Sequence, residues 1–149
     1  MPGKYFEDVS VGDRFVTPRR TITETDIVTF RNLAGMFEDL FLDREYVETQ
    51  TPFKKRIAPG ALTYSFAEGL VVLLHLFQGT SLAFLGLDEL RLPAPVACDD
   101  TIYVEIEITG KRESKSPDRG IVQARHTVKN QRGETVMHFN VARMLRRRE

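Results

Sequence analysis

The sequence predicts an α+β fold in which an antiparallel β-sheet wraps around one long helix. Two observations predict it. Residues 60–77 are apolar on almost every side, so a helix formed by them needs cover all round. Four segments that read as strands follow, and residues 101–109 alternate strictly between aliphatic and polar side chains. A sheet with one face on the core alternates in this way, so these strands would supply the cover.

The N-terminal elements are predicted as a strand and a short helix. A turn at residues 11–13 precedes a strand over 14–22. Thr23 and Asp26 have the spacing of a capping box, in which each side chain bonds the other residue's backbone N–H. Gly35 can adopt the positive φ that ends a helix. We therefore expect a helix between Thr23 and Gly35.

Residues 36–59 carry no sustained hydrophobic period and are predicted as a long loop. Pro52 and Pro59 disfavour helix immediately before them. A single helical turn over residues 43–47 is compatible with the sequence. A loop of this length in a compact domain is usually functional, which directs the search for a site to it.

The second half of the chain is predicted as strands joined by turns. A Gln-Arg-Gly turn at residues 131–133 joins the last two strands as a hairpin. The expected strands are residues 82–92, 101–109, 120–129 and 135–145. Such a single layer leaves strand edges and part of the helix uncovered, so we expect pairing into a homodimer.

Length and composition limit the classes of protein to which this chain can belong. Residues 1–149 fit one domain, and equal numbers of basic and acidic side chains, 21 each, give no reason to expect a nucleic-acid partner. The N-terminal residues form no signal-peptide core, and no apolar run is long enough to cross a membrane. One Cys suits a reducing compartment, so we expect a cytoplasmic protein. No metal-binding motif or phosphate-binding loop is present, and we expect no cofactor.

Two short motifs lie in the segment from Thr23 to Phe77. Residues 36–43 read Met-Phe-Glu-Asp-Leu-Phe-Leu-Asp, and residues 56–60 read Arg-Ile-Ala-Pro-Gly before the long helix. This order resembles the MaoC-like hydratases, the R-specific enoyl-CoA hydratase branch of the hotdog fold. In that family the loop reads roughly Asp-x-Asn-Pro-x-His-x-Asp, and the approach to the helix reads Arg-Ile-x-His-Gly. The resemblance implies a hotdog fold and a 2-enoyl thioester of CoA or of a carrier protein as substrate.

When the two motifs are aligned without gaps, this chain has other residues at the positions of the family's reactive side chains. The catalytic Asp falls on Met36, the catalytic His on Phe41, and the His before the helix glycine on Pro59. None of these side chains exchanges a proton. Glu38 and Asp39 lie in the same loop and are the predicted proton-transfer groups, provided that an apolar pocket raises their pKa. The alternative is that both are solvated loop acids.

The resemblance also implies where the thioester would bind. In the family, a backbone N–H near the start of the long helix polarises the thioester carbonyl, and the first N–H groups of any helix are unpaired. The predicted substrate-binding residues are therefore Phe41, Arg56, Pro59, Gly60 and Ala61.

Two other functions remain open. The protein could be a homodimer that binds an acyl thioester without turning it over. It could also be a hotdog thioesterase that uses Glu68, the only acid in residues 60–77. A buried carboxylate without a partner is costly. A structural role for Glu68 therefore predicts a basic partner on the sheet, such as Arg91 or Arg125.

The three histidines lie outside the resemblance motifs. His75 is expected within the long helix as a hydrogen-bonded core residue. His126 and His138 lie on predicted strands, where surface or packing roles are expected.

Overall fold

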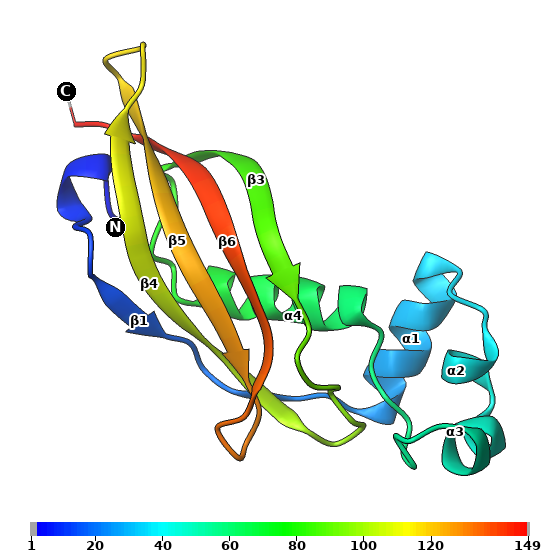
Figure 1. Cartoon of the computed structure of the whole chain (residues 1–149). Coiled ribbons are helices and arrows are strands. Elements are labelled where there is room, and N and C mark those ends of the chain that lie inside the picture. Colours follow the sequence, from blue (N-terminus) through cyan, green and yellow to red (C-terminus); the bar gives the residue numbers. More distant parts are fainter. Residues whose placement is uncertain (1–2, 149) are drawn as a thin grey trace.

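A computed structural model describes residues 3–148 and confirms the α+β hotdog arrangement. Within these residues the structure shows a six-stranded antiparallel sheet with the strand order β1-β4-β5-β6-β3, and β2 also pairs with β4. Figure 1 shows this sheet curving around α4. The strands are β1 Arg14–Val16, β2 Arg20–Thr21, β3 Ser81–Arg91, β4 Thr101–Glu113, β5 Arg119–Lys129 and β6 Thr135–Arg146. The helices are the 3₁₀ turn Phe6–Asp8, α1 Glu24–Ala34, α2 Asp39–Leu42, α3 Arg44–Gln50 and α4 Gly60–Leu73.

The alternating pattern of β4 directs one face of the sheet to the core, as predicted. Its aliphatic side chains at residues 102, 104, 106 and 108 are all buried. They pack in the same cluster as Leu62, Ala67 and Leu70 of α4 and Phe139 of β6. Burial of apolar area against the helix therefore selects this face and the strand register with it.

The long helix is shorter than the sequence predicts, and part of its surface is exposed. It ends at Leu73 rather than at residue 77, and turns follow to residue 80. Val72 and Leu73 are 66% and 57% exposed, so the single chain leaves part of the helix uncovered, as expected for one sheet layer. The reason is that the sheet covers one side of α4 only. Edge strand β3 exposes further large apolar side chains, Leu82, Phe84 and Leu85.

The N-terminal helix has the predicted caps. The Thr23 hydroxyl accepts from the Asp26 N–H at 3.1 Å, and the Asp26 carboxylate accepts from the Thr23 N–H at 2.9 Å. Gly35 follows with a φ of 71°. The strand predicted over 14–22 is divided into β1 and β2, and both pair with β4.

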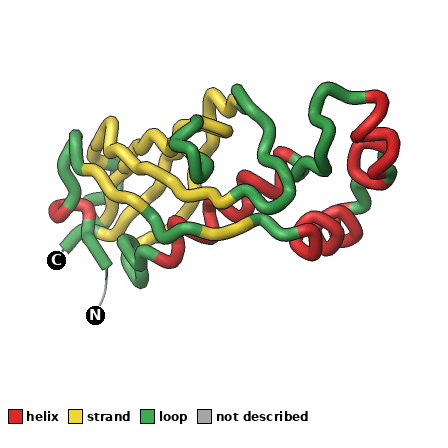
Figure 2. The backbone as a smooth tube through the Cα atoms, turned by 90° about the horizontal axis from the view of Figure 1, so that it is seen from below, coloured by secondary structure: helices red, strands yellow, loops and turns green. Residues whose placement is uncertain are grey.

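The segment predicted as a long loop contains two short helices. Helix α2 was not expected, and α3 is longer than the single turn over 43–47. The Asp43 carboxylate explains its start, because it accepts from the Tyr46 N–H at 3.0 Å. Figures 1 and 2 show α1, α2 and α3 gathered beyond one end of the sheet, with α4 running back beneath it.

Candidate active site

The start of α4 carries two backbone donors without acceptors. Pro59 is the N-cap residue, and its carbonyl accepts from the N–H groups of Leu62 and Thr63. The N–H groups of Gly60 and Ala61 have no acceptor among residues 3–148. A Cβ at position 60 would lie 2.7 Å from the Leu92 Cδ2 atom, so the bare glycine permits this close approach. Two free N–H groups at a helix start can stabilise a negatively charged oxygen.

The predicted proton-transfer carboxylates lie at the start of α2. Glu38 is its N-cap residue and Asp39 its first residue. Both are exposed, and neither carboxylate has a hydrogen bond or ion pair within the described part of the chain. Phe37 and Leu42 beside them are also exposed. The two carboxylates are therefore free to meet a ligand, and in the single chain they face solvent.

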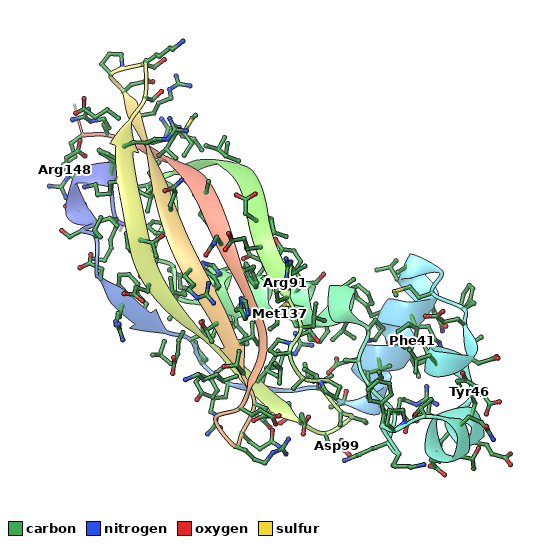
Figure 3. The ribbon with its side chains drawn as sticks, viewed as in Figure 1. Phe41, Tyr46, Arg91, Asp99, Met137 and Arg148 are labelled. Carbon is green, nitrogen blue, oxygen red and sulfur yellow. The ribbon has the colours of Figure 1, made fainter. Side chains whose placement is uncertain are left out.

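The other predicted substrate contacts differ in accessibility. Phe41 is 7% exposed, and Figure 3 places it among α1, α2 and α3. Pro59 is buried, whereas Ala61 is exposed. The Arg56 guanidinium is engaged inside the protein, because its Nη1 donates to the Phe41 carbonyl at 3.0 Å. Gly60 and Ala61 thus offer groups to a ligand directly.

Glu68 has a basic partner on the sheet, as a structural role for this residue predicts. Its Oε2 lies 2.6 Å from Nη2 of Arg143 on β6. The partner is Arg143 and neither of the two arginines named as examples, Arg91 and Arg125. Arg125 alternates with the buried His126 and therefore sits on the opposite face of β5, and Arg91 is exposed at the end of β3.

The strand pattern contains the signal for Arg143. Along β6 the side chains of Phe139, Val141, Arg143 and Leu145 follow one another at a spacing of two, and the three apolar ones are buried. Side chains two residues apart share a face. Arg143 therefore lies on the core-facing side of β6, from which its side chain can reach α4.

Burial and charge set the protonation of this cluster. The His126 side chain is 2% exposed, and burial, aided by the Arg143 guanidinium, lowers the pKa of His126 to about 3. The Glu68 Oε1 lies 3.6 Å from Nδ1 of His126, but the Glu68 charge is already compensated by Arg143. Burial and the Glu68 carboxylate raise the pKa of Tyr64. Both His126 and Tyr64 are therefore neutral at pH 7.

The remaining histidines are placed as follows. His75 lies in the turn after α4, is exposed and has a φ of 52°, so its assignment as a core helix residue is wrong. The helix ends two residues earlier, which removes the burial that a helical position would have had. His126 is a packing residue against Phe139, with ring centres 5.0 Å apart. His138 is half-buried on β6.

Other features of the described residues bear on ligand binding. A cavity of about 390 Å³ lies at the C-terminal end of α4, lined by residues such as Val72, His75 and Arg143, away from the free N–H groups. Among residues 3–148 no three His, Cys, Asp or Glu side chains gather in a way that could hold a metal ion. No helix in the same range is both long and apolar enough to span a bilayer.

Comparisons with known proteins agree with this architecture. A family model described as the MaoC-like domain matches residues 8–130. The β-methylmalyl-CoA dehydratase of Chloroflexus aurantiacus is 29% identical over 99% of this chain and 42% of its own length. The chain spans less than half the length of the curated relatives it matches.

Solved structures are similar over nearly the whole chain. A structure described as a monoamine oxidase regulatory protein from Archaeoglobus is 35% identical, with a TM-score of 0.91, and the match covers 99% of this chain and 97% of that one. The R-hydratase PhaJ1 from Pseudomonas aeruginosa is 27% identical, with a TM-score of 0.79, over 97% and 86% of the two chains.

Proposed function

Because the chain belongs to the MaoC-like domain family, we propose that it is a hydratase or dehydratase of 2-enoyl thioesters with a non-standard active site. The observation that carries this proposal is the pair of free N–H groups at Gly60 and Ala61, together with the unpaired carboxylates of Glu38 and Asp39. The relatives named as a dehydratase and an R-hydratase support the reaction class. CoA or a carrier protein would carry the acyl group.

The N–H groups would act on the thioester carbonyl. When water adds to Cβ of the enoyl group, negative charge develops on the thioester oxygen as an enolate. Donors that are already aimed at that oxygen stabilise the transition state more than the substrate. Of the five predicted substrate contacts, Gly60 and Ala61 would bind the oxygen. Phe41 and Pro59 would form apolar walls, and Arg56 would hold the loop beside them.

A single carboxylate can serve both proton transfers. Glu38 or Asp39 would accept a proton from the attacking water as its oxygen bonds to Cβ. The resulting carboxylic acid would then donate that proton to Cα, which collapses the enolate and regenerates the carboxylate. The reverse sequence removes water from a 3-hydroxyacyl thioester. Because both side chains are exposed in the single chain, the reaction would need a cover that excludes bulk water from them.

A second copy of the chain would cover the surface that the single chain leaves exposed. We propose a homodimer formed through the exposed apolar surface of the α4 end and edge strand β3, which includes Val72, Leu73 and Phe84. An unpaired edge strand with apolar side chains is a template for pairing. The buried single thiol, Cys98, suits the reducing cytoplasm in which we propose the protein works.

The test is turnover of 2-enoyl-CoA substrates of short and medium chain length, followed as loss of the enoyl-thioester absorbance. Substitution of the true proton-transfer residue, by Glu38→Gln or Asp39→Asn, is expected to lower kcat by about 10²- to 10⁴-fold. Glu48→Gln on exposed α3 is the matched control and should leave kcat unchanged. Wild-type turnover in both loop variants would contradict the assignment of these carboxylates.

One observation favours a second function, binding without turnover. Met36, Phe41 and Pro59 occupy the positions at which the resemblance places the acid–base groups, and none of them can transfer a proton. Saturable binding of an acyl-CoA with no hydration and no release of CoA would establish that function. The thioesterase alternative is disfavoured by the ion pair between Glu68 and Arg143. Release of CoA that Glu68→Gln abolishes would restore it.

A further inference from the structure

One backbone carbonyl receives two guanidinium groups from different parts of the chain. The Phe41 carbonyl accepts from Nη1 of Arg31 at 2.8 Å and from Nη1 of Arg56 at 3.0 Å. Phe41 lies in α2, a helix of four residues whose last carbonyls have no partner within the helix. Charged donors make the stronger class of hydrogen bond. The two arginines therefore fix the position of α2 from two sides.

Each arginine is held in turn by its own surroundings. The Arg56 side chain is 13% exposed, and its Nε lies 3.4 Å from Oε1 of Glu24 on α1. Nε of Arg31 donates to the Asn32 side chain at 3.2 Å. The Arg56 Nε atom is buried and has no hydrogen-bond partner in the described residues, so its contact with Glu24 is one of charge alone. Arg56 thereby joins α1 and α2 through one side chain.

The backbone of Arg56 is anchored to the sheet side of the molecule. Its carbonyl accepts from the Cys98 N–H at 2.8 Å, and the Ala58 N–H donates to the Val96 carbonyl at 2.8 Å. Ile57 forms a β-bridge with Ala97. Arg56 thus connects the well-packed part of the protein to the helices beyond the end of the sheet.

Both reacting parts of the proposed site lie close to this contact along the chain. Asp39 is two residues before Phe41 in the same helix, and Gly60 follows Arg56 by four residues. The hydrogen bonds at the Phe41 carbonyl therefore tie the helix that carries Asp39 to Arg56, which precedes the start of α4 by four residues. Small errors in such a separation are costly, since a displacement of about 1 Å can lower a rate about 10²-fold.

We propose that Arg31 and Arg56 are positioning residues, which hold the Glu38 and Asp39 carboxylates at working distance from the N–H groups of Gly60 and Ala61. This inference rests on the proposed hydratase function. Neither arginine touches the substrate in this role. Their loss should therefore lower kcat more than it raises KM.

The experiment compares Arg31→Met and Arg56→Met with Arg44→Met. Arg44 pairs with Glu24, as Arg56 does, but makes no contact with the Phe41 carbonyl, so it is the matched control. For each variant, kcat per folded protein and KM are measured with a 2-enoyl-CoA. We expect kcat to fall at least about tenfold in the first two, with KM within about threefold. Arg44→Met should stay within about twofold. Arg31→Lys, which keeps a charged donor, should recover most of the loss.

A second measurement separates this inference from the proposed function. Hydrogen exchange at the α2 amides of Phe41 and Leu42, whose N–H groups bond the Glu38 carbonyl, should become faster in Arg31→Met and Arg56→Met only. Unchanged kcat or unchanged exchange in these variants would overturn the positioning role, as would a raised KM at constant kcat. If the wild-type protein shows no turnover, the hydratase function is refuted, and the catalytic part of this inference with it. The hydrogen-exchange rates would still decide whether the two arginines hold α2 in place.

Discussion

The sheet with α4 and the three helices beyond its end are stabilised in different ways. The first region packs a large cluster of apolar side chains and keeps its carboxylate, Glu68, inside, paired with Arg143. In the second, residues 24–50, Ile27 of α1 reaches into that same cluster, and the other buried side chains of the helices are Phe41 and Val47. Polar contacts from arginines hold them, and the carboxylates of Glu38 and Asp39 remain unpaired. A paired, enclosed acid suits a structural role, and a free acid suits chemistry.

The largest expected effect comes from breaking the enclosed pair. Arg143→Met leaves the Glu68 charge without a partner between helix and sheet, which should lower the free energy of unfolding by about 3 kcal/mol. Urea unfolding at pH 7 measures it. Arg14→Met is the control, because Arg14 forms an exposed pair with Glu107 and should cost less than about 1 kcal/mol. If the double variant Arg143→Met/Glu68→Leu recovers stability, the uncompensated charge is the cause of the loss. Equal losses of stability in Arg143→Met and the control Arg14→Met would refute this explanation.

Acid should weaken the same region through His126. Its pKa in the folded protein is about 3, below the ordinary 6.5, so between these values the unfolded chain binds the proton and the folded chain does not. Stability is therefore lost as the pH falls from 6.5 toward 3. Between pH 7 and pH 5 this one group should shift the unfolding equilibrium about 25-fold. His126→Gln should show a correspondingly weaker pH dependence in urea unfolding, and identical slopes would contradict the buried, neutral imidazole.

A smaller effect is expected from the cap of α1 in the second region. Thr23→Ala removes the hydroxyl that accepts from the Asp26 N–H and should cost about 1 kcal/mol. Thr25→Ala, at an exposed position within the helix, is the control and should change stability little. Thermal unfolding of the two variants side by side measures the difference. Equal melting temperatures would show that the capping bond contributes nothing net.

The smallest effect on stability should come from the free carboxylates. Asp39→Asn and Glu38→Gln remove charges that have no partner in the described residues, so the free energy of unfolding should change by less than about 0.5 kcal/mol. The same urea titration measures it. A loss as large as that of Arg143→Met would show that these acids are structural, and the contrast between the two regions would fail.

Much of the fold could be read from periodic and capping patterns. The alternation in β4, the capping box at Thr23 and the glycine end of α1 were all predicted and are confirmed, because each depends on residues a few positions apart. The extent of α4 was not predictable in this way. Its apolar composition continues to Phe77, but backbone turns end the helix at Leu73.

The residues of the candidate site also divide into those that local sequence patterns identify and those that only the tertiary structure brings together. The sequence alone determined that Glu38 and Asp39 are neighbours in the segment before the long helix and that Gly60 and Ala61 open that helix, since these are local features. Only the tertiary structure decided that Arg143 meets Glu68 across 75 residues, and that Arg31 and Arg56 converge on the Phe41 carbonyl. Several arginines could satisfy either contact by charge alone. Sheet register and helix packing choose among them, because they bring together side chains that no local pattern relates.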